Sequence, residues 1–88
     1  MSACPPLSFS NVDAAAWGRV KAMAAKEYGV TVSSNTDAVS AAGFTIEWDY
    51  NTGLDLLTVQ CLVSPFLVPC ETINTHLTAA VNGALAAT

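Results

Sequence analysis

Three cysteines and one histidine are the residues whose chemistry could make a site in this chain, and most of them fall in the stretch CLVSPFLVPCETINTH, residues 61–76. Together they would supply four ligands for zinc. Structural zinc sites usually pair their ligands about two to four residues apart, whereas eight residues separate Cys61 from Cys70 and five separate Cys70 from His76. Cys4 lies far away near the N-terminus. The spacing therefore does not predict a metal site.

Cys70 is the candidate nucleophile, because it lies where a helix is expected to begin and a helix N-terminus favours the reactive thiolate. Burial on the apolar side of that helix and the neighbouring Glu71 both act against the thiolate. His76 is poorly placed as a base, since residues six apart on one helix are turned by about 240 degrees and lie about 9 Å apart along the axis. We therefore expect a core thiol and a helix-flank imidazole.

A disulfide between Cys61 and Cys70 is a further option, because both side chains are expected to face the core. Closing a loop of about ten residues would stabilise the fold by about 2.7 kcal/mol in the chain-entropy model. Its formation depends on the redox compartment. The odd count of three cysteines argues against a complete disulfide framework. The sequence does not decide whether Cys61 and Cys70 form this bond.

Glu47 and Asp49 are the remaining candidates, because residues two apart on a strand share one face at a separation of about 7 Å. Such a pair could do acid-base chemistry or hold a hard cation. The pattern places no third carboxylate nearby, and an open sheet face lacks the cavity that tunes a catalytic group. We expect a solvated face, and we predict no catalytic, cofactor-binding or metal-binding residue.

The elements that would position these residues start with a helix over about 11–28. Residues 1–9 are expected to be a flexible tail that contains Cys4, and residues 10–88 a single domain. Ser10 followed by Asp13 indicates a capping box, and Gly29 suits a left-handed C-terminal cap. The apolar stripe of this helix recurs at helical spacing and consists of Val12, Ala16, Val20 and Met23, with Trp17, Ala24 and Tyr28 on its flank.

Alternating residues predict three strands after this helix. A short strand at 30–33 is followed by a turn at 34–37. The run from Phe44 to Tyr50 alternates without exception, and a connector at 51–53 joins it to a strand at 54–63. The residues expected to face the core are Phe44, Ile46, Trp48 and Tyr50 from the second strand and Leu57, Val59, Cys61 and Val63 from the third.

A second helix is predicted from about residue 70 to about 82 or 86, with Gly83 at its uncertain end. Its stripe consists of Ile73, Leu77, Ala80, Val81, Ala84 and Leu85. These elements predict an α+β, two-layer sandwich in which a three-stranded antiparallel meander carries the N- and C-terminal helices on one face, in the order α-β-β-β-α.

The net charge of the chain argues against nucleic acids and anionic membranes as partners. The chain has 88 residues and a formal net charge of −4, which repels phosphate backbones and anionic lipid headgroups. The segment Met1–Leu7 has neither the basic nor the apolar region of a secretory signal, and no apolar run is long enough to span a membrane. We expect a cytoplasmic protein with no nucleic-acid or membrane partner.

The expected order of elements resembles that of the double-stranded-RNA-binding domain, and TAAVNGAL at 78–85 is similar to the alanine-rich close of that family's last helix. Members of that family bind phosphate groups with a lysine cluster at the start of that helix. Here the corresponding stretch is PCETINTH at 69–76, which has no lysine and one glutamate. The resemblance therefore implies a similar order of elements without the binding chemistry.

Partner binding is the function that the pattern favours. In a three-stranded meander the strand at 54–63 is an edge, which invites a second copy of the chain or an incoming peptide strand. Alternatively, the segment 64–69, with Phe66 and Leu67, folds over that edge. We expect a small non-enzymatic interaction or structural module that could form a homodimer through 54–63. The alternatives are a protein that binds a small apolar ligand between helices and sheet, and a thiol-dependent enzyme that uses Cys70.

Overall fold

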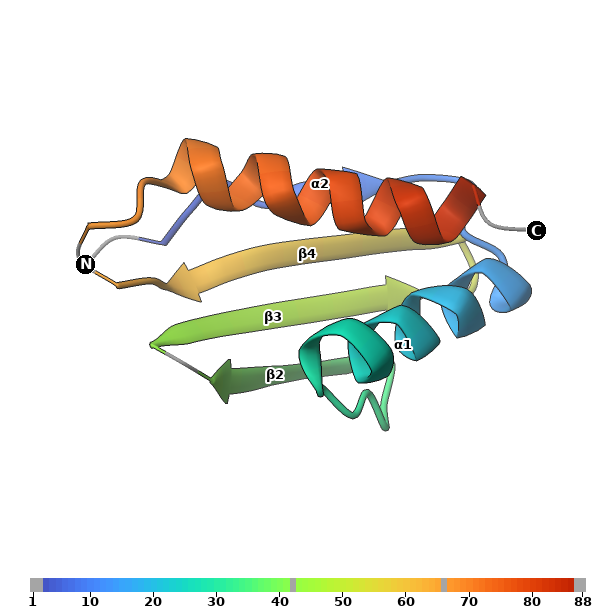
Figure 1. Cartoon of the computed structure of the whole chain (residues 1–88). Coiled ribbons are helices and arrows are strands. Elements are labelled where there is room, and N and C mark those ends of the chain that lie inside the picture. Colours follow the sequence, from blue (N-terminus) through green and yellow to red (C-terminus); the bar gives the residue numbers. More distant parts are fainter. Residues whose placement is uncertain (1–2, 42, 66, 87–88) are drawn as a thin grey trace.

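A four-stranded antiparallel sheet carries two helices on one face (Figure 1). The computed structural model of the chain describes residues 3–41, 43–65 and 67–86. The strands lie in the order β1-β4-β3-β2. The elements in chain order are β1 (Leu7–Phe9), α1 (Ala14–Tyr28), β2 (Thr36–Ala41), β3 (Phe44–Asn51), β4 (Leu56–Val63) and α2 (Cys70–Ala86). The predicted α+β class, with both helices on one side of a meander, is confirmed, and the sheet gains a fourth strand.

The additional strand lies in the segment that the sequence predicted to be a tail. Leu7 to Phe9 pair with Leu57 to Val59 of β4, and Phe9 is buried in the core. The prediction of a flexible tail over residues 1–9 is therefore wrong for this strand. The alternation of Leu7, Ser8 and Phe9 is the signal that could have found it, because apolar residues at every second position suit a half-buried strand.

β4 is consequently an inner strand, and the prediction that residues 54–63 form a sheet edge is wrong. β1 pairs with one side of it and β3 with the other. The alternative cover, the segment 64–69, does not take this role in the described residues, since Leu67 is 85% exposed. Phe66 lies outside the described residues.

Helix α1 starts later than predicted and ends where predicted. Its N-cap is Asp13, whose carboxylate accepts a hydrogen bond from the Ala16 N–H at 2.8 Å. Ser10 does not cap the helix, because Asn11 has a φ of 60° and turns the chain before the helix can begin. Gly29 has a φ of 66° and forms the left-handed C-cap. Ala16, Trp17 and Val20 are buried, as the apolar stripe predicted.

The first strand of the meander is β2 at 36–41, and the predicted strand at 30–33 is wrong. Val30 and Val32 do pack against the core, but they do so in an irregular connection. The turn predicted at 34–37 is shortened accordingly. Two tryptophans fix the start of β2, because the indole N–H groups of Trp48 and Trp17 donate to the Ser34 carbonyl and the Asn35 side chain, each at 3.0 Å.

Strand β3 alternates as predicted, with Trp48 and Tyr50 buried and Glu47 and Asp49 exposed. It follows β2 through a hairpin in which Ala41 pairs with Phe44 and Gly43 has a φ of 86°. Glycine adopts this backbone region without the steric cost that a side chain brings.

The connection from β3 to β4 differs from the predicted three-residue connector at 51–53. Asn51 is the last residue of β3, and the turn covers residues 52–55. The Asn51 side-chain oxygen accepts from the N–H groups of Gly53 and Leu54 at 3.0 and 3.1 Å. The positive φ belongs to Asp55, at 52°, rather than to the glycine.

Strand β4 buries Leu57, Val59 and Cys61 as predicted. The prediction for Val63 is wrong, because this side chain is 44% exposed. Ile46 pairs with Cys61 and the neighbouring Thr45 pairs with Val63, so β4 holds one extra residue at this step. A bulge of this kind breaks the alternation of faces that the sequence pattern assumes.

Helix α2 continues through Gly83 to Ala86 and buries Ile73, Val81 and Ala84, which belong to the predicted stripe. It runs along β4, and α1 lies beside it over β2 and β3 (Figure 1). Neither helix in the described part of the chain has the length and hydropathy that crossing a bilayer requires.

The core is centred on stacked aromatic rings that join α1 to the sheet. The rings of Trp17 and Tyr50 lie 4.9 Å apart at an interplanar angle of 21°. The buried Tyr50 hydroxyl donates to the Val12 carbonyl oxygen at 2.6 Å. Burial raises the pKa of Tyr50, and the carboxylates of Asp55 and Asp13 raise it further. The phenol therefore stays protonated and remains a donor across the neutral range.

We predict that Tyr50→Phe lowers the free energy of unfolding by about 1–3 kcal/mol, because the Val12 carbonyl loses its donor. The native protein should also lose stability as the pH rises beyond the ordinary tyrosine pKa of 10.0, since its folded form holds the phenol proton more tightly than the unfolded chain. This loss should be smaller in the variant. Urea unfolding at neutral and alkaline pH measures both effects.

Tyr28→Phe is the matched control. Tyr28 is 47% exposed, so removal of its hydroxyl should change stability by less than about 0.5 kcal/mol. Equal losses in the two variants would contradict a specific role for the Tyr50 hydroxyl.

Candidate functional site

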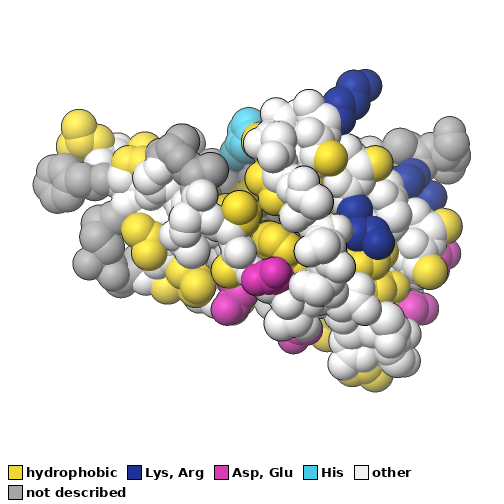
Figure 2. Space-filling view, turned by 90° about the horizontal axis from the view of Figure 1, so that it is seen from below, with side chains coloured by type: hydrophobic (Ala, Val, Ile, Leu, Met, Phe, Trp, Pro, Cys, Tyr) yellow, Lys and Arg dark blue, Asp and Glu magenta, His cyan; other side chains and the backbone are white. Residues whose placement is uncertain are grey.

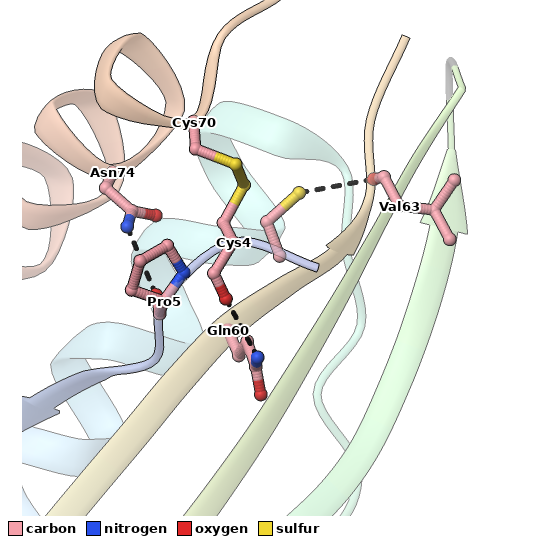
Figure 3. Close-up of a disulfide and its surroundings, with 7 residues drawn as sticks. Cys4, Pro5, Gln60, Val63, Cys70 and Asn74 are labelled. Carbon is pink, nitrogen blue, oxygen red and sulfur yellow. Dashed lines mark hydrogen bonds between the residues drawn. A yellow bond between two sulfur atoms is a disulfide. The ribbon is translucent and has the colours of Figure 1, made fainter. Parts of the chain in front are cut away.

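The three cysteines gather at one end of the sheet, where Cys4 and Cys70 form a disulfide (Figure 3). Their Cα atoms lie 5.3 Å apart although the residues are separated by 66 positions in the sequence. Cys61 is a free, buried thiol. The bond between Cys61 and Cys70 that the sequence left open is therefore not formed. Cys70 carries no free thiol for nucleophilic attack in this structure.

Hydrogen bonds reinforce the tie between the N-terminal segment and the rest of the fold (Figure 3). The Cys4 N–H donates to the Cys61 carbonyl at 2.9 Å, and the Gln60 side chain donates to the Cys4 carbonyl at 2.8 Å. The Asn74 side chain on α2 donates to the Pro5 carbonyl at 3.1 Å. The segment before β1 therefore continues along β4 beyond the three residue pairs that β1 itself makes.

Cys61 is 0% exposed and packs with Cys4 and Ile73. Burial raises the pKa of its thiol above the ordinary value of 9.0. The thiol donates to the Val63 carbonyl oxygen at 3.2 Å. A protonated thiol without solvent access is a poor nucleophile, so Cys61 has the character of a core residue.

His76 lies away from the cysteines and contacts Tyr28 instead. The Tyr28 hydroxyl and His76 Nε2 lie 2.7 Å apart, which joins the end of α1 to α2. This places an imidazole on the flank of the helix, as predicted. Over the described residues, no group of three or more His, Cys, Asp or Glu side chains is placed to hold a metal ion.

Glu47 and Asp49 lie exposed on the outer face of the sheet, where the sequence placed them. The Thr36 hydroxyl donates to the Asp49 carboxylate at 2.9 Å. Ala38, a small residue, is paired with Glu47. These side chains stand on an open surface, and their geometry is that of a charged face rather than an enclosed acid-base pair.

The free edge of β2 is a feature that the sequence did not reveal. β2 is the last strand of the sheet and pairs only with β3. The Tyr50 N–H donates to the Asn35 carbonyl at 2.7 Å, which marks a hydrogen-bonded pair just before β2. Such pairs alternate along an antiparallel ladder. The residues whose backbone groups point to the free edge are therefore Thr36, Ala38 and Ser40.

Side chains next to this edge occupy two of its backbone groups. The Ser34 hydroxyl donates to the Thr36 carbonyl at 3.0 Å, and the Asp37 carboxylate accepts from the Ala38 N–H at 2.8 Å. Local caps of this kind restrain indiscriminate strand pairing. The Gly43 hairpin was the available signal for β2, and the apolar residues at 30–33 obscured it by suggesting an earlier strand.

Two hollows on the surface are lined by helix residues alone. One, of about 440 Å³, lies on α2 next to Asn74 and Thr78. The other, of about 530 Å³, lies between α1 and α2 next to Arg19 and Gly83. Neither of these two hollows lies between the helices and the sheet, which is where the alternative function would place a small apolar ligand.

Comparison of the chain with protein-family models, with curated proteins and with solved structures gives no match. The resemblance to the double-stranded-RNA-binding domain in element order therefore finds no counterpart in a family match. The structure also differs from the expected order, because β1 precedes the first helix.

We predict that the double variant Cys4→Ser, Cys70→Ser loses about 4 kcal/mol of unfolding free energy. The chain-entropy model assigns this magnitude to a loop as long as the one that the disulfide closes, with its ends 66 positions apart. Chemical denaturation measures the loss. A reductant should lower the native protein to the stability of the variant and leave the variant unchanged. Equal stability of the oxidised native protein and the variant would refute a structural role for the bond.

We also predict that Cys61 does not react with an aromatic disulfide reagent in the folded protein, because the thiol is buried and protonated. Labelling should be at least about a hundredfold slower than in denaturant, since it must await an opening of the structure. Mass spectrometry identifies the labelled residue. Rapid native labelling at Cys61 would contradict its assignment to the core.

Proposed function

We propose that this chain is a small non-enzymatic interaction module that binds an extended segment of a protein partner along the free edge of β2. The observation that carries the proposal is the set of backbone groups that β2 turns away from the sheet. A peptide laid beside them can add a strand, with main-chain hydrogen bonds supplying affinity and side-chain contacts supplying selectivity. The participating residues are Thr36, Ala38 and Ser40. An added strand would displace the Ser34 and Asp37 side chains from the Thr36 carbonyl and the Ala38 N–H.

The two edges of the sheet differ in a way that supports this choice of site. β2 has six residues, whereas β1 at the opposite edge has three. At the opposite edge, the segment before β1 is held by the disulfide of Cys4 and by the hydrogen bond from Gln60 to the Cys4 carbonyl. β2 therefore offers the longer pairing surface, and Figure 1 shows it at the outer margin of the sheet.

The chemistry of the cysteines favours binding over catalysis. Cys70 is bonded to Cys4, and Cys61 is buried. A disulfide persists in oxidising surroundings and opens in a reducing cytosol. The cytoplasmic location stays a prediction, and the redox state of Cys4 and Cys70 in the cell would test it.

We predict that Ala38→Pro abolishes binding of extended peptides while the domain remains folded. Proline removes an N–H that points away from β3, so the existing ladder keeps its hydrogen bonds, and the ring obstructs an incoming strand. A panel of short, end-capped peptides of alternating polar and apolar residues can be screened against both proteins by fluorescence anisotropy. Circular dichroism verifies the fold of the variant.

Ala38→Thr is the matched control, because it keeps the N–H and a strand-compatible backbone. It should bind the same peptides as the native protein. Unchanged binding by Ala38→Pro would refute the proposed site, and the absence of binding by every extended peptide would refute the proposed function.

A further inference from the structure

We infer that the strand which β2 accepts is basic on one side and apolar on the other, so that its partner is a protein segment with Lys or Arg at alternate positions. This inference rests on the proposed function and adds the chemistry of the partner. It follows from the distribution of charge around the edge and from the sizes of the side chains that β2 places there.

The basic residues lie on the helix side of the sheet, and the outer face next to the edge carries acidic side chains. One cation approaches the edge on the helix side, because Lys21 lies over the ring of Trp17, whose indole N–H donates to Asn35 just before β2. All three basic residues belong to α1, and β2 and β3 contribute only acidic residues to the charge near the edge. Figure 2, which is seen from below relative to Figure 1, shows Lys and Arg side chains in the upper and middle parts of the view and Asp and Glu side chains mostly in the lower part.

Glu47 and Asp49 present their carboxylates on the outer face of the sheet. Asp37 is paired with Trp48 and therefore points to the inner face, where its carboxylate accepts from the Ala38 N–H.

On the outer face, the Glu47 and Asp49 carboxylates lie within reach of a strand added beside β2. Thr36, Ala38 and Ser40 are small, and Ala38 is paired with Glu47. A strand added beside β2 would lie about 10 Å from β3, which is two strand spacings. A Lys or Arg side chain of that strand can extend across the Ala38 methyl group to the Glu47 carboxylate. Within the described residues, Glu47 has no ion pair that would compete.

The inner face of the edge calls for a different kind of side chain. Val39 is half-buried and packs against the core together with Val32. Figure 2 shows hydrophobic side chains at the surface between the helices and the acidic groups. Because successive residues of a strand point to opposite faces, an added strand would place apolar side chains here and basic ones on the outer face.

A second copy of this chain fits the edge less well. Residues opposite each other in an antiparallel pair point to the same face, so two β2 strands would pair about Ala38 or about Val39. Either register brings the acidic residues of both copies to one junction without a Lys or Arg from either sheet. Like charges placed together oppose association. A basic partner removes this repulsion.

Three end-capped peptides of equal length test the inference, with Lys and Val, Thr and Val, or Glu and Val in alternation. The Lys peptide should bind the native protein about two- to tenfold more tightly than the Thr peptide, and the Glu peptide should bind least. Its advantage should shrink as salt is added. Fluorescence anisotropy gives the affinities, and analytical ultracentrifugation reports the oligomeric state.

Glu47→Gln should weaken binding of the Lys peptide about two- to fivefold and leave the Thr peptide unaffected. Glu71→Gln is the matched control, because this exposed carboxylate belongs to the first turn of α2, and it should change neither affinity. Ala38→Pro should abolish binding of all three peptides.

The outcomes separate this inference from the proposal on which it rests. Equal affinities for the Lys and Thr peptides, each lost in Ala38→Pro, would overturn the basic partner and retain strand addition at β2. A native dimer that Ala38→Pro converts to a monomer would show that a second copy occupies the edge, which also overturns the inference. Failure of all peptides with a monomeric native protein would overturn both.

Discussion

The covalent tie between Cys4 and Cys70 is the constraint on which the arrangement of the sheet depends. It holds the segment before β1 against α2, and the backbone of that segment covers β4. β4, the more apolar of the two eight-residue strands, is thereby enclosed on both sides. Among the strands that the structure describes, β2 alone keeps a free edge longer than three residues, and the bond lies at the opposite margin of the sheet.

The position of β2 depends in turn on the aromatic core. Trp48 donates to the Ser34 carbonyl and Trp17 donates to the Asn35 side chain. Tyr50 holds the chain just before α1 through its bond to the Val12 carbonyl. Each of these rings buries a large apolar surface while its polar atom finds a partner, which avoids the cost of an unsatisfied buried group. The three side chains therefore stabilise the core, and the two tryptophans also fix the start of the free edge.

The edge of β2 is acidic because the basic residues of the chain belong to a different element. A helix carries the basic residues, and the two strands next to the edge carry acidic ones. The side-chain hydrogen bonds to the Thr36 carbonyl and the Ala38 N–H restrain non-specific strand pairing. An edge that is long, partly capped and acidic suits a partner selected by charge as well as by backbone pairing.

Periodicity in the sequence determined the two helices, the alternation of β3, most of the inward positions of β4 and the α+β class, because these patterns arise from local backbone geometry. It correctly placed Cys61 in the core and His76 on a helix flank. It could not determine the pairing of the fourth strand with β4, the true start of β2 or the pairing of Cys4 with Cys70. Those features depend on contacts between residues far apart in the sequence, and a local pattern carries no record of such contacts. The tertiary structure alone decided which edge stays open, because β1 covers β4 through pairs such as Leu7 with Val59, whose members are far apart in the sequence.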